Sequence, residues 1–494
     1  MAGKVLIANR GEISVRIARA LAELSLPSVA VYTDADRDAL HARRADEALN
    51  IGEGRAAYLD VERIVSAAQA VGAWGVHPGY GFLSESSDLC RACDAAGLVF
   101  IGPPASAIYE MGDKARARKR MQEAGVPVVP GGPADTLDEA KATARGVGYP
   151  VLLKATAGGG GKGMRRVDDE AELERALERT RSEAEKSFGD GSVYIEKAII
   201  GARHVEIQVL GDQHGNLVHL FERDCSLQRR HQKIVEETPC PSLRDATREA
   251  MCQVAVAGAR AIGYYSAGTF EFLLGQDQSF YFLEMNTRLQ VEHPITELVT
   301  GVDLVHEMLR VADGAPLSFE RAERRGVAIE ARVYAEDPEQ GFLPAPGRIE
   351  RLSAPSGPFV RDDGGVVSGS WVSPEFDPLL SKLSVWGRTR HEALARLRRA
   401  LGEYSVLGVA TNLAFLERLI AHPRVVAGDY DTTFVERSAS ELRDATDAEQ
   451  QLRDALLLTA LAADSDFGAL PPTTASGTSS GWRDYVRPPA TRYR

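Results

Sequence analysis

Residues 284–293 read EMNTRLQVEH, and polar and apolar side chains alternate along this stretch. In a β-strand, successive side chains point to opposite faces, so the even-numbered residues would share one face over roughly 25 Å. That face presents an acid, an amide, a guanidinium, an amide and an acid, in the order Glu284, Asn286, Arg288, Gln290 and Glu292. A solvent-exposed edge strand would explain the alternation but not this order of groups. The stretch therefore predicts a strand with a polar site on one face and apolar packing on the other.

The run that precedes this stretch completes a hairpin. GTFEFLL (268–274) and FYFLEMN (280–286) both have the composition of strands, and the residues between them favour a turn. If Gly275 pairs with Phe280, then Glu271 lies opposite Glu284, with the two residues about 5 Å apart. The face that packs on the core would then carry four apolar side chains: Phe270, Phe272, Leu283 and Met285.

Two carboxylates in this arrangement repel each other unless a cation lies between them. Mg²⁺ is typically held by one or two carboxylates together with substrate phosphates. The alternatives are two solvated glutamates or a one-residue slip of the register, but a slip would turn phenylalanine side chains outward. We therefore predict a metal site at Glu271 and Glu284, with Asn286 beside it. Farther along, the planar guanidinium of Arg288 suits a small oxyanion, and Glu292 is suited to act as a general base.

A glycine-rich loop lies between two further predicted strands, PVLLKA (150–155) and MRRV (164–167). Successive glycines allow backbone N–H groups to approach an anion closely, and residues 158–161 are all glycine. The Walker A pattern does not fit, because Gly163 stands where Ser or Thr would be and a strand follows. A flexible flap over phosphates and a disordered hairpin tip are both compatible with the glycines, and Lys154 beside the loop favours phosphate binding.

The composition restricts the class of protein. With 494 residues about three domains are expected, and the formal net charge of −12 argues against nucleic acid as the main partner. We find no secretory signal and no apolar run of membrane-spanning length. Five cysteines suit a reducing compartment, so a cytoplasmic location is expected. Cys90 and Cys93 share one face of an expected helix without a second pair to complete a zinc site, and are predicted to be ordinary buried thiols.

Up to Pro103, short apolar strands alternate with helices, which predicts a parallel sheet covered by helices on both faces. No G-x-G-x-x-G motif occurs there, so a dinucleotide site is not supported. Residues 110–125 predict one helix, whose basic residues are expected to form a solvated face: Arg116, Arg118, Lys119 and Arg120. Strand-rich sequence begins near residue 330, an amphipathic helix is expected near residues 448–463, and residues 469–481 have the composition of a linker.

Most of the chain up to about residue 440 resembles biotin carboxylase, an ATP-grasp ligase. The resemblance rests on motifs that occur in the family's order: NRGEI (9–13), HPGYGFLSE (77–85), MGDK (111–114), GGGGKGM (158–164), RHVEIQV (203–209), ERDCSLQRRHQK (222–233), GTFEF (268–272), EMNTRLQVEHPITE (284–297) and AEDP (335–338). RRHQK together with NTRLQVEH separates this family from other ATP-grasp enzymes. The resemblance implies that ATP phosphorylates bicarbonate to carboxyphosphate, whose CO₂ is transferred to N1′ of biotin with release of ADP and phosphate.

The resemblance also implies an α/β fold of three domains and a tail. Residues 1–108 would form a Rossmann-like N-terminal domain, residues 109–330 an ATP-grasp core with a mobile lid at about 126–200, and residues 331–445 a mixed α+β C-terminal domain. Residues 446–494 would form a helical extension and a flexible tail. Closure of the lid would exclude water, which matters because carboxyphosphate hydrolyses readily.

Carried over motif by motif, the resemblance implies a set of ATP contacts: Lys114, Lys154, Gly159, Gly160, Gly161, Glu196, Lys197, His204, Gln228, His231 and Lys233. Of these, Lys233 would also lie near the transferred phosphate and act in catalysis. Glu271 and Glu284, helped by Asn286, would hold one or two Mg²⁺ ions, with Mn²⁺ as an alternative.

The same resemblance implies how the other substrates are bound. Bicarbonate would be held by three residues: Arg288, Gln290 and Val291. Glu292 would deprotonate it, and Arg332 would stabilise the biotin enolate. Read from the residues alone, Arg332 would more simply form a surface salt bridge. Tyr80 would pack either near biotin or in the core.

Carrier biotin is expected on another protein, since this family attaches it to a lysine that usually lies between two methionines. No lysine here does so, and none follows Lys382. A separate biotin carboxyl carrier protein and a carboxyltransferase subunit are therefore expected as partners, and a homodimer is implied by the family. The final carboxyl acceptor would be chosen by the carboxyltransferase. Two alternatives are another ATP-grasp ligase that joins a carboxylate to an amine, and an inactive scaffold that docks the carrier.

Overall fold

The computed structural model describes residues 3–134, 136–155, 164–188 and 191–442, together with Leu457. Contacts within the chain separate two units, Met1–Leu442 and Arg443–Arg494, and the fold given below is that of the first unit. The glycine loop at 158–163 and, apart from Leu457, the predicted extension at 446–494 lie outside the described residues.

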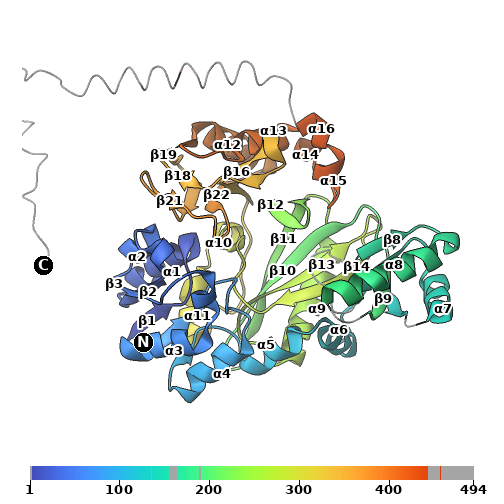
Figure 1. Ribbon diagram of the computed structural model, residues 1–494, viewed down its shortest axis with the longest axis horizontal. Coiled ribbons are helices and arrows are strands. Elements are labelled where there is room, and N and C mark those ends of the chain that lie inside the picture. Colours follow the sequence, from blue (N-terminus) through green and yellow to red (C-terminus); the bar gives the residue numbers. More distant parts are fainter. Residues whose placement is uncertain (1–2, 135, 156–163, 189–190, 443–456, 458–494) are drawn as a thin grey trace, which may run out of the picture. The chain divides into compact units, whose positions relative to one another are not determined.

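The N-terminal part forms a five-stranded parallel sheet, as the alternation of strands and helices predicts (Figure 1). Its strand order β3-β2-β1-β4-β5 corresponds to Glu47–Asn50, Ser28–Tyr32, Lys4–Ile7, Ala73–His77 and Val99–Phe100. The helices α1, α2, α3 and α4 span Gly11–Glu23, Leu40–Arg44, Val61–Ala70 and Ser87–Ala95. Val5 and Ile7 share a core with α1, whereas Leu6 shares another with α3 and α4, so helices cover both faces. Cys90 and Cys93 are buried on α4, as predicted.

A separate four-stranded antiparallel sheet lies within the segment expected to form a lid. Its strand order β6-β9-β7-β8 corresponds to Gly131–Pro133, Val193–Lys197, Val151–Ala155 and Met164–Val167. The helices α7 (Leu137–Val147) and α8 (Glu170–Phe188) pack against this sheet. Leu153 and Ile195 belong to a hydrophobic cluster that is distinct from the clusters of the other parts. This segment therefore has a core of its own.

The largest sheet has eight strands, and every neighbouring pair in it is antiparallel. Its order β14-β13-β10-β11-β12-β15-β22-β20 corresponds to Phe280–Asn286, Ser266–Leu274, Arg203–Gly211, Leu217–Arg229, Gln232–Thr238, Val327–Tyr334, Leu379–Gly387 and Val360–Gly364. Val205, Ile207 and Phe270 form an apolar cluster with the helix α9 (Asp245–Ala261). Because side chains alternate along a strand, Glu206 points to the other face of the sheet.

The hairpin of β13 and β14 brings Glu271 opposite Glu284 as predicted, but by a different register at its turn. Leu274, rather than Gly275, pairs with Phe280, and a β-bulge at Leu283 then restores the predicted register. The bulge also changes which side chains face the core. Phe282 packs there with the other phenylalanines, whereas Leu283, predicted to be buried, is 36% exposed and lines a cavity.

The strand predicted for residues 284–293 is shorter than the alternation suggests. β14 ends at Asn286 and the helix α10 (His293–Thr300) begins seven residues later, with a proline in its first turn that favours the helical start. Even-numbered side chains as far as Gln290 still line one cavity, and Leu289 is fully buried in the core. Val291 also lines the cavity, so the strict alternation predicted for this stretch is wrong beyond Gln290.

Residues 110–125 belong to two helices rather than one: α5, Ala105–Met111, and α6, Lys114–Glu123. The Asp113 carboxylate accepts a hydrogen bond from the Arg116 N–H, so it caps a new helix where the sequence predicts continuity. The solvated face expected on this segment is wrong for Arg118, which lines the cavity and bonds to Glu196.

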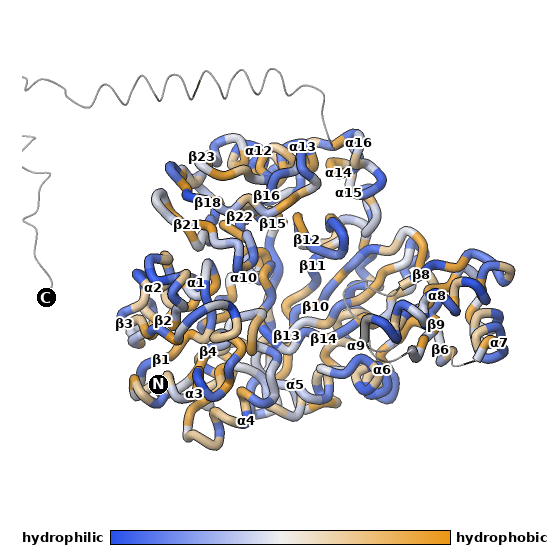
Figure 2. Tube along the Cα trace, viewed as in Figure 1, coloured by the Kyte–Doolittle hydropathy of each residue, from blue (hydrophilic) through white to orange (hydrophobic). Residues whose placement is uncertain are grey.

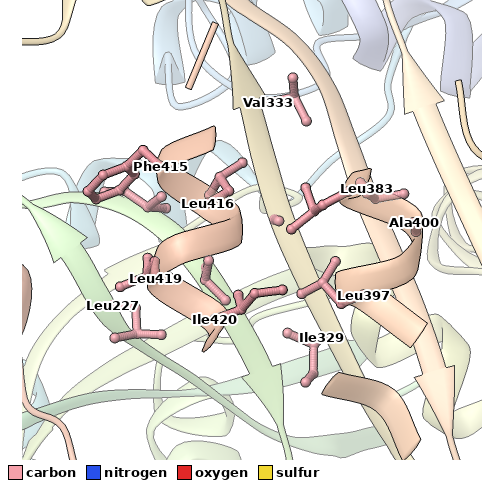
Figure 3. Packing of buried hydrophobic residues seen from close by; sticks show 14 of the residues in the cluster. Leu227, Ile329, Val333, Leu383, Leu397, Ala400, Phe415, Leu416, Leu419 and Ile420 are labelled. Carbon is pink, nitrogen blue, oxygen red and sulfur yellow. The ribbon is translucent and has the colours of Figure 1, made fainter. Parts of the chain in front are cut away.

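The C-terminal part adds β15, β22 and β20 to the large sheet and packs helices against them. Figure 3 shows the resulting cluster, in which α12 (Arg390–Glu403) and α13 (Leu413–Ala421) meet the strands: Leu227, Ile329, Val333, Leu383, Leu397, Ala400, Phe415, Leu416, Leu419 and Ile420. The remaining elements are short, apart from α11 at Leu304–Ala312: α14 Pro423–Ala427, α15 Phe434–Arg437, α16 Ala439–Leu442, β16 Glu336–Asp337, β17 Leu343–Pro344, β18 Gly347–Arg348, β19 Arg351–Ser353, β21 Trp371–Val372 and β23 Ser405–Leu407.

Hydrophobic and hydrophilic residues interchange along the described part of the chain (Figure 2). No helix among the described residues combines the length and the apolar composition that crossing a membrane requires.

We predict that Leu416→Ala lowers the free energy of unfolding by about 2–5 kcal/mol, because the side chain is fully buried and its removal leaves a cavity in the cluster of Figure 3. Leu343→Ala in the same part of the chain is the matched control; Leu343 is 58% exposed, so a change below about 0.5 kcal/mol is expected. Urea unfolding followed by circular dichroism measures both. Equal unfolding curves for the two variants would contradict this packing.

Candidate active site

A cavity of about 1640 Å³ lies between the large sheet, the sheet of β7 and β9, and the N-terminal loops. It is lined by nearly all the described residues that the sequence predicts for the site: Tyr80, Lys114, Lys154, Glu196, Lys197, His204, Gln228, His231, Lys233, Glu271, Glu284, Asn286, Arg288, Gln290, Val291 and Arg332. Glu292 is fully buried behind this wall and contacts two of its residues. The predicted phosphate contacts Gly159, Gly160 and Gly161 lie outside the described residues.

Lys233, on β12, joins three buried carboxylates. Its ammonium nitrogen lies 2.6 Å from Glu206 Oε2, 2.9 Å from Glu271 Oε1 and 2.7 Å from Glu292 Oε1. Although burial acts to lower it, the negative charges around Lys233 hold its pKa well above the usual value. The ammonium group is therefore a fixed cation in the cavity wall, suited to attract an anionic oxygen of a substrate.

Glu271 and Glu284 lie next to each other with different electrostatic surroundings. Against the effect of burial, Lys233 and His204 hold the pKa of Glu271 well below its usual range. Burial and the charge of Glu271 raise the pKa of Glu284, and within the described part of the chain its carboxylate has no hydrogen bond or ion pair. Asn286 Nδ2 donates to Glu271 Oε1 over 3.0 Å. Two carboxylates and an amide oxygen are ligands that fit Mg²⁺, and a divalent cation there would offset the repulsion.

Other polar residues of this wall come from β10, from β11 and from the turn between β11 and β12. His204 Nε2 lies 3.0 Å from Glu271 Oε2, and although burial acts to lower it, that carboxylate raises the pKa of His204. Gln228 lies near the end of β11 and pairs with Lys233 of β12, whereas His231 lies in the turn and has a left-handed backbone with φ of 67°. Both residues line the cavity.

Arg288 is held in place by groups on both sides. Its Nη2 donates to Asn286 Oδ1 over 2.8 Å and its Nη1 to Gln290 Oε1 over 3.2 Å. Its Nε donates over 3.0 Å to Glu85 Oε2, a residue that sequence reasoning did not assign to the site although it ends the motif HPGYGFLSE. The guanidinium is thereby oriented on the cavity wall, where its planar fork suits a small oxyanion.

Arg332, on β15, is buried and bridges two carboxylates. Its Nη2 donates to Glu292 Oε2 over 3.0 Å, and its Nε donates to Glu236 Oε1 over 2.6 Å. The surface salt bridge that the sequence alone predicts for Arg332 is therefore wrong, because its ion pairs with Glu236 and Glu292 are buried. Against the effect of burial, Lys233 and Arg332 hold the pKa of Glu292 well below its usual range, so its carboxylate is ionised and can accept a proton.

On β9, Glu196 pairs with two cations. It forms ion pairs with Lys154 and with Arg118, whose Nη1 lies 3.2 Å from Glu196 Oε1. Lys197 instead donates to two backbone carbonyls, those of Gly148 and Tyr149. Lys114 and Arg118 lie four residues apart and so share a face of α6, a spacing that could have identified Arg118 from the sequence.

Two further residues support the site from behind. Arg223 is fully buried, and its Nε donates to Glu206 Oε1 over 2.5 Å, which fixes the carboxylate that contacts Lys233. No local signal in the sequence distinguishes Arg223 from its basic neighbours. Tyr80 both lines the cavity and packs against an apolar cluster, and its ring centroid lies 5.6 Å from the Lys382 ammonium. The core packing predicted for Tyr80 is therefore present in part, and its contact with biotin stays a prediction.

Three family models match consecutive segments of the chain. Residues 1–108 match the biotin carboxylase N-terminal domain, residues 113–320 the carbamoyl-phosphate synthase L chain ATP-binding domain, and residues 330–437 the biotin carboxylase C-terminal domain. The chain belongs to the biotin carboxylase family. The family and the fold class predicted from the sequence are thereby confirmed.

Relatives of this biotin carboxylase chain differ in length. Biotin carboxylase 2 of Bacillus subtilis is 51% identical over 441 residues, which cover 88% of this chain and 99% of that protein. The mitochondrial methylcrotonoyl-CoA carboxylase subunit alpha of Arabidopsis thaliana is 49% identical over 447 residues, which cover 89% of this chain and 61% of that protein. The chain thus spans about three fifths of the length of the methylcrotonoyl-CoA carboxylase subunits that it matches.

Solved structures of biotin carboxylases share the fold. One is the biotin carboxylase domain dimer of Hydrogenobacter thermophilus 2-oxoglutarate carboxylase in complex with MgADP, ADP and bicarbonate. It is 45% identical, has a TM-score of 0.84 and covers 90% of this chain and 99% of that chain. The biotin carboxylase of Campylobacter jejuni is 43% identical, with a TM-score of 0.83 and coverage of 88% and 98%.

We predict that Lys233→Met lowers the free energy of unfolding by about 3–5 kcal/mol at neutral pH, because it leaves three buried carboxylates without their shared cation. Glu271 and Glu292 have folded-state pKa values below their unfolded values. The stability that they contribute is present above the unfolded pKa, about 4.3, and is lost as the pH falls through the folded values. Urea unfolding should therefore show a smaller difference between variant and wild type near pH 4 than at pH 7.

The matched control is Lys4→Met, which breaks an ion pair with Glu47 whose two side chains are 36% and 48% exposed. A loss of no more than about 1 kcal/mol is expected there. A Lys233→Met protein as stable as the Lys4→Met protein at neutral pH would contradict the buried cluster.

Proposed function

We propose that this chain carries out ATP- and bicarbonate-dependent carboxylation of biotin, with carboxyphosphate as intermediate and ADP and phosphate as products. One observation carries the proposal. A single cavity wall joins the facing carboxylates of Glu271 and Glu284 to the guanidinium groups of Arg288 and Arg332, with Lys233 between them. This arrangement suits a reaction in which a phosphate and a small carboxylate-like anion must meet.

The nucleotide would lie between the two sheets. Glu196, with its cations Lys154 and Arg118, lines the cavity from the sheet of β7 and β9, and Glu271 and Glu284 line it from the large sheet. A Mg²⁺ ion held by Glu271, Glu284 and Asn286 would neutralise phosphate charge, and Mn²⁺ has the same ligand preferences. The lid segment at about 126–200, together with the glycines 159–161, would close over the phosphates and exclude water.

Bicarbonate would bind to Arg288, with Gln290 and Val291 beside it. Glu292 is ionised, so it can accept the proton of bicarbonate, although its contact with Lys233 lowers its pKa. When Lys233 turns toward a phosphate oxygen, Glu292 loses one cation and its pKa rises, which makes it a stronger base at that moment. The order of groups along residues 284–293 thereby follows the order of the chemistry, from metal to anion to base.

Arg332 would face the biotin that receives the carboxyl group. A guanidinium stays charged at every relevant pH, so it can stabilise negative charge that develops on the ureido oxygen. Tyr80 lines the same cavity and would pack against the biotin rings. The biotin would be presented to this cavity by a biotin carboxyl carrier protein.

The partners follow from this reaction. We propose a biotin carboxyl carrier protein, a carboxyltransferase subunit that selects the final acceptor, and a homodimer of this chain in the cytoplasm. The domain boundaries that go with this proposal are residues 1–108, 109–330 and 331–445, followed by a tail.

The test is ADP release by the purified chain with ATP, Mg²⁺, bicarbonate and free biotin. We predict that release requires both bicarbonate and biotin and that Glu284→Gln lowers its rate by roughly 100-fold, because one ligand charge at the proposed metal is lost. The matched control is Asp277→Asn on the loop of the same hairpin, which is exposed and should retain the wild-type rate. Release that depends on an amine instead of biotin, or a Glu284→Gln rate equal to the control, would reject the proposal.

A further inference from the structure

A second pair of glutamates faces each other on the large sheet, away from the proposed metal site. Glu236 on β12 pairs directly with Glu330 on β15 in the antiparallel register. Directly opposite residues of an antiparallel pair point to the same face, and like charges in that position destabilise the sheet. Both residues are 0% exposed, so water cannot screen the repulsion. The structure must therefore reduce the charge of this pair in another way.

The hydrogen bonds of the two carboxylates leave one oxygen of each without a donor. Glu236 Oε1 accepts from Arg332 Nε over 2.6 Å, and Glu330 Oε2 accepts from Ser384 Oγ over 2.7 Å. Glu236 Oε2 and Glu330 Oε1 are both buried and have no hydrogen-bond partner among the described residues. An unpartnered buried oxygen is costly, and a carboxyl O–H donated from one glutamate to the other would satisfy both oxygens at once.

A metal ion does not fit this pair. Within the described ranges, neither Glu236 nor Glu330 belongs to a group of three side chains that could ligate an ion together, whereas Glu271 forms such a group with His204 and Glu206. Mg²⁺ prefers six oxygen ligands in near-octahedral geometry and usually keeps several waters, whereas both glutamate side chains are 0% exposed.

The cations around the pair already have other partners. Lys382, opposite Arg332 on β22, lies 3.1 Å from Glu12 Oε2, and Arg332 also contacts Glu292. Lys233, on the same strand as Glu236, contacts three other carboxylates. Burial raises the pKa of Glu236 to about 7, and burial together with the charge of Glu236 raises the pKa of Glu330 well above its usual range.

We propose that Glu236 and Glu330 share one proton, so that the pair carries a single negative charge and positions Arg332 without neutralising it. The role of the pair in catalysis rests on the proposed function, whereas the existence of the shared proton does not depend on it. Arg332 already faces the charges of Glu236 and Glu292, and ionisation of Glu330 would add a third. With Glu330 protonated, one negative charge fewer lies near Arg332, so its guanidinium attracts an anionic substrate group more strongly, while Glu236 fixes the orientation of that guanidinium. Glu236 and Glu330 are thus positioning residues that act through Arg332.

The proton is tested directly by infrared difference spectroscopy of protein labelled with ¹³C at the glutamate carboxyl groups. We predict a protonated-carboxyl signal at pH 7 that is smaller in Glu330→Gln than in the wild type, because Glu236 then carries the single charge alone. Glu237→Gln is the matched control: Glu237 follows Glu236 on the same strand and is fully paired with Arg390, so the signal should persist. Burial raises the pKa of Glu12 to about 7 as well, so Glu12 also contributes to the signal. The readout is therefore the difference in signal between the wild type and Glu330→Gln.

A wild-type protein without any protonated-carboxyl signal at pH 7 would overturn the proposal, whether or not the variants fold. An undiminished signal in Glu330→Gln would overturn it as well.

The catalytic meaning is tested by the pH dependence of biotin-dependent ADP release. In the wild type, kcat should fall as the pair loses its proton above neutral pH, because the additional charge weakens Arg332. In Glu330→Gln that charge cannot form, so the alkaline fall in kcat should shift to higher pH. Glu236→Gln should lower kcat about tenfold with little change in KM for ATP, since only the orientation of Arg332 is disturbed.

Identical pH profiles for wild type and Glu330→Gln would reject the positioning role even if the infrared signal is present. If the wild type releases no ADP with biotin and bicarbonate, the proposed function fails, and the infrared result still decides whether the proton is shared.

Discussion

Carboxylates that face one another across neighbouring strands are the constraint on which this site depends. Glu206 of β10 lies opposite Glu271 of β13, which in turn lies opposite Glu284 of β14. Glu236 of β12 lies opposite Glu330 of β15. Each contact would destabilise the sheet if both groups were ionised and nothing lay between them. Lys233 bridges the first pair, with its ammonium within 2.9 Å of both carboxylates. At the other two pairs, the proposed metal would offset the repulsion between Glu271 and Glu284, and the proposed proton would offset that between Glu236 and Glu330.

The cost of this charged face is offset on the other side of the same strands. Phe270 and Phe272 flank Glu271 in sequence, and both are fully buried in an apolar cluster with α9. Because side chains alternate, each residue that projects a charge toward the cavity is anchored by neighbours that bury apolar surface. A buried ion pair adds little net stability by itself, so the apolar face is what keeps these strands in register.

The pairing of Glu271 with Glu284 could be predicted from local sequence pattern. The two strands of the hairpin are joined by a short turn, and the apolar alternation in each strand indicates which side chains share a face. The bulge at Leu283 could not be predicted, since a one-residue offset at the turn and its later correction leave the same pairing of the acids. The alternation continues beyond Asn286 and so predicts a longer strand. The side chains of residues 287–290 are instead positioned by tertiary contacts, because β14 ends at Asn286. Glu85 lies 203 residues from its partner Arg288, a separation at which sequence pattern carries no information on contact.

The pairing of β12 with β15 places Lys233 and Arg332, the residues proposed to meet phosphate and biotin, on adjacent strands. β12 lies within the segment that matches an ATP-binding domain, whereas most of β15 and its Arg332 lie in the segment that matches the C-terminal domain. One continuous sheet therefore crosses the boundary between the two matched segments. Lys233 and Arg332 meet at Glu292, which contacts both of them. Under the proposed function, a nucleotide that changes the charge around Lys233 would therefore also change the surroundings of Arg332 through a single carboxylate, Glu292.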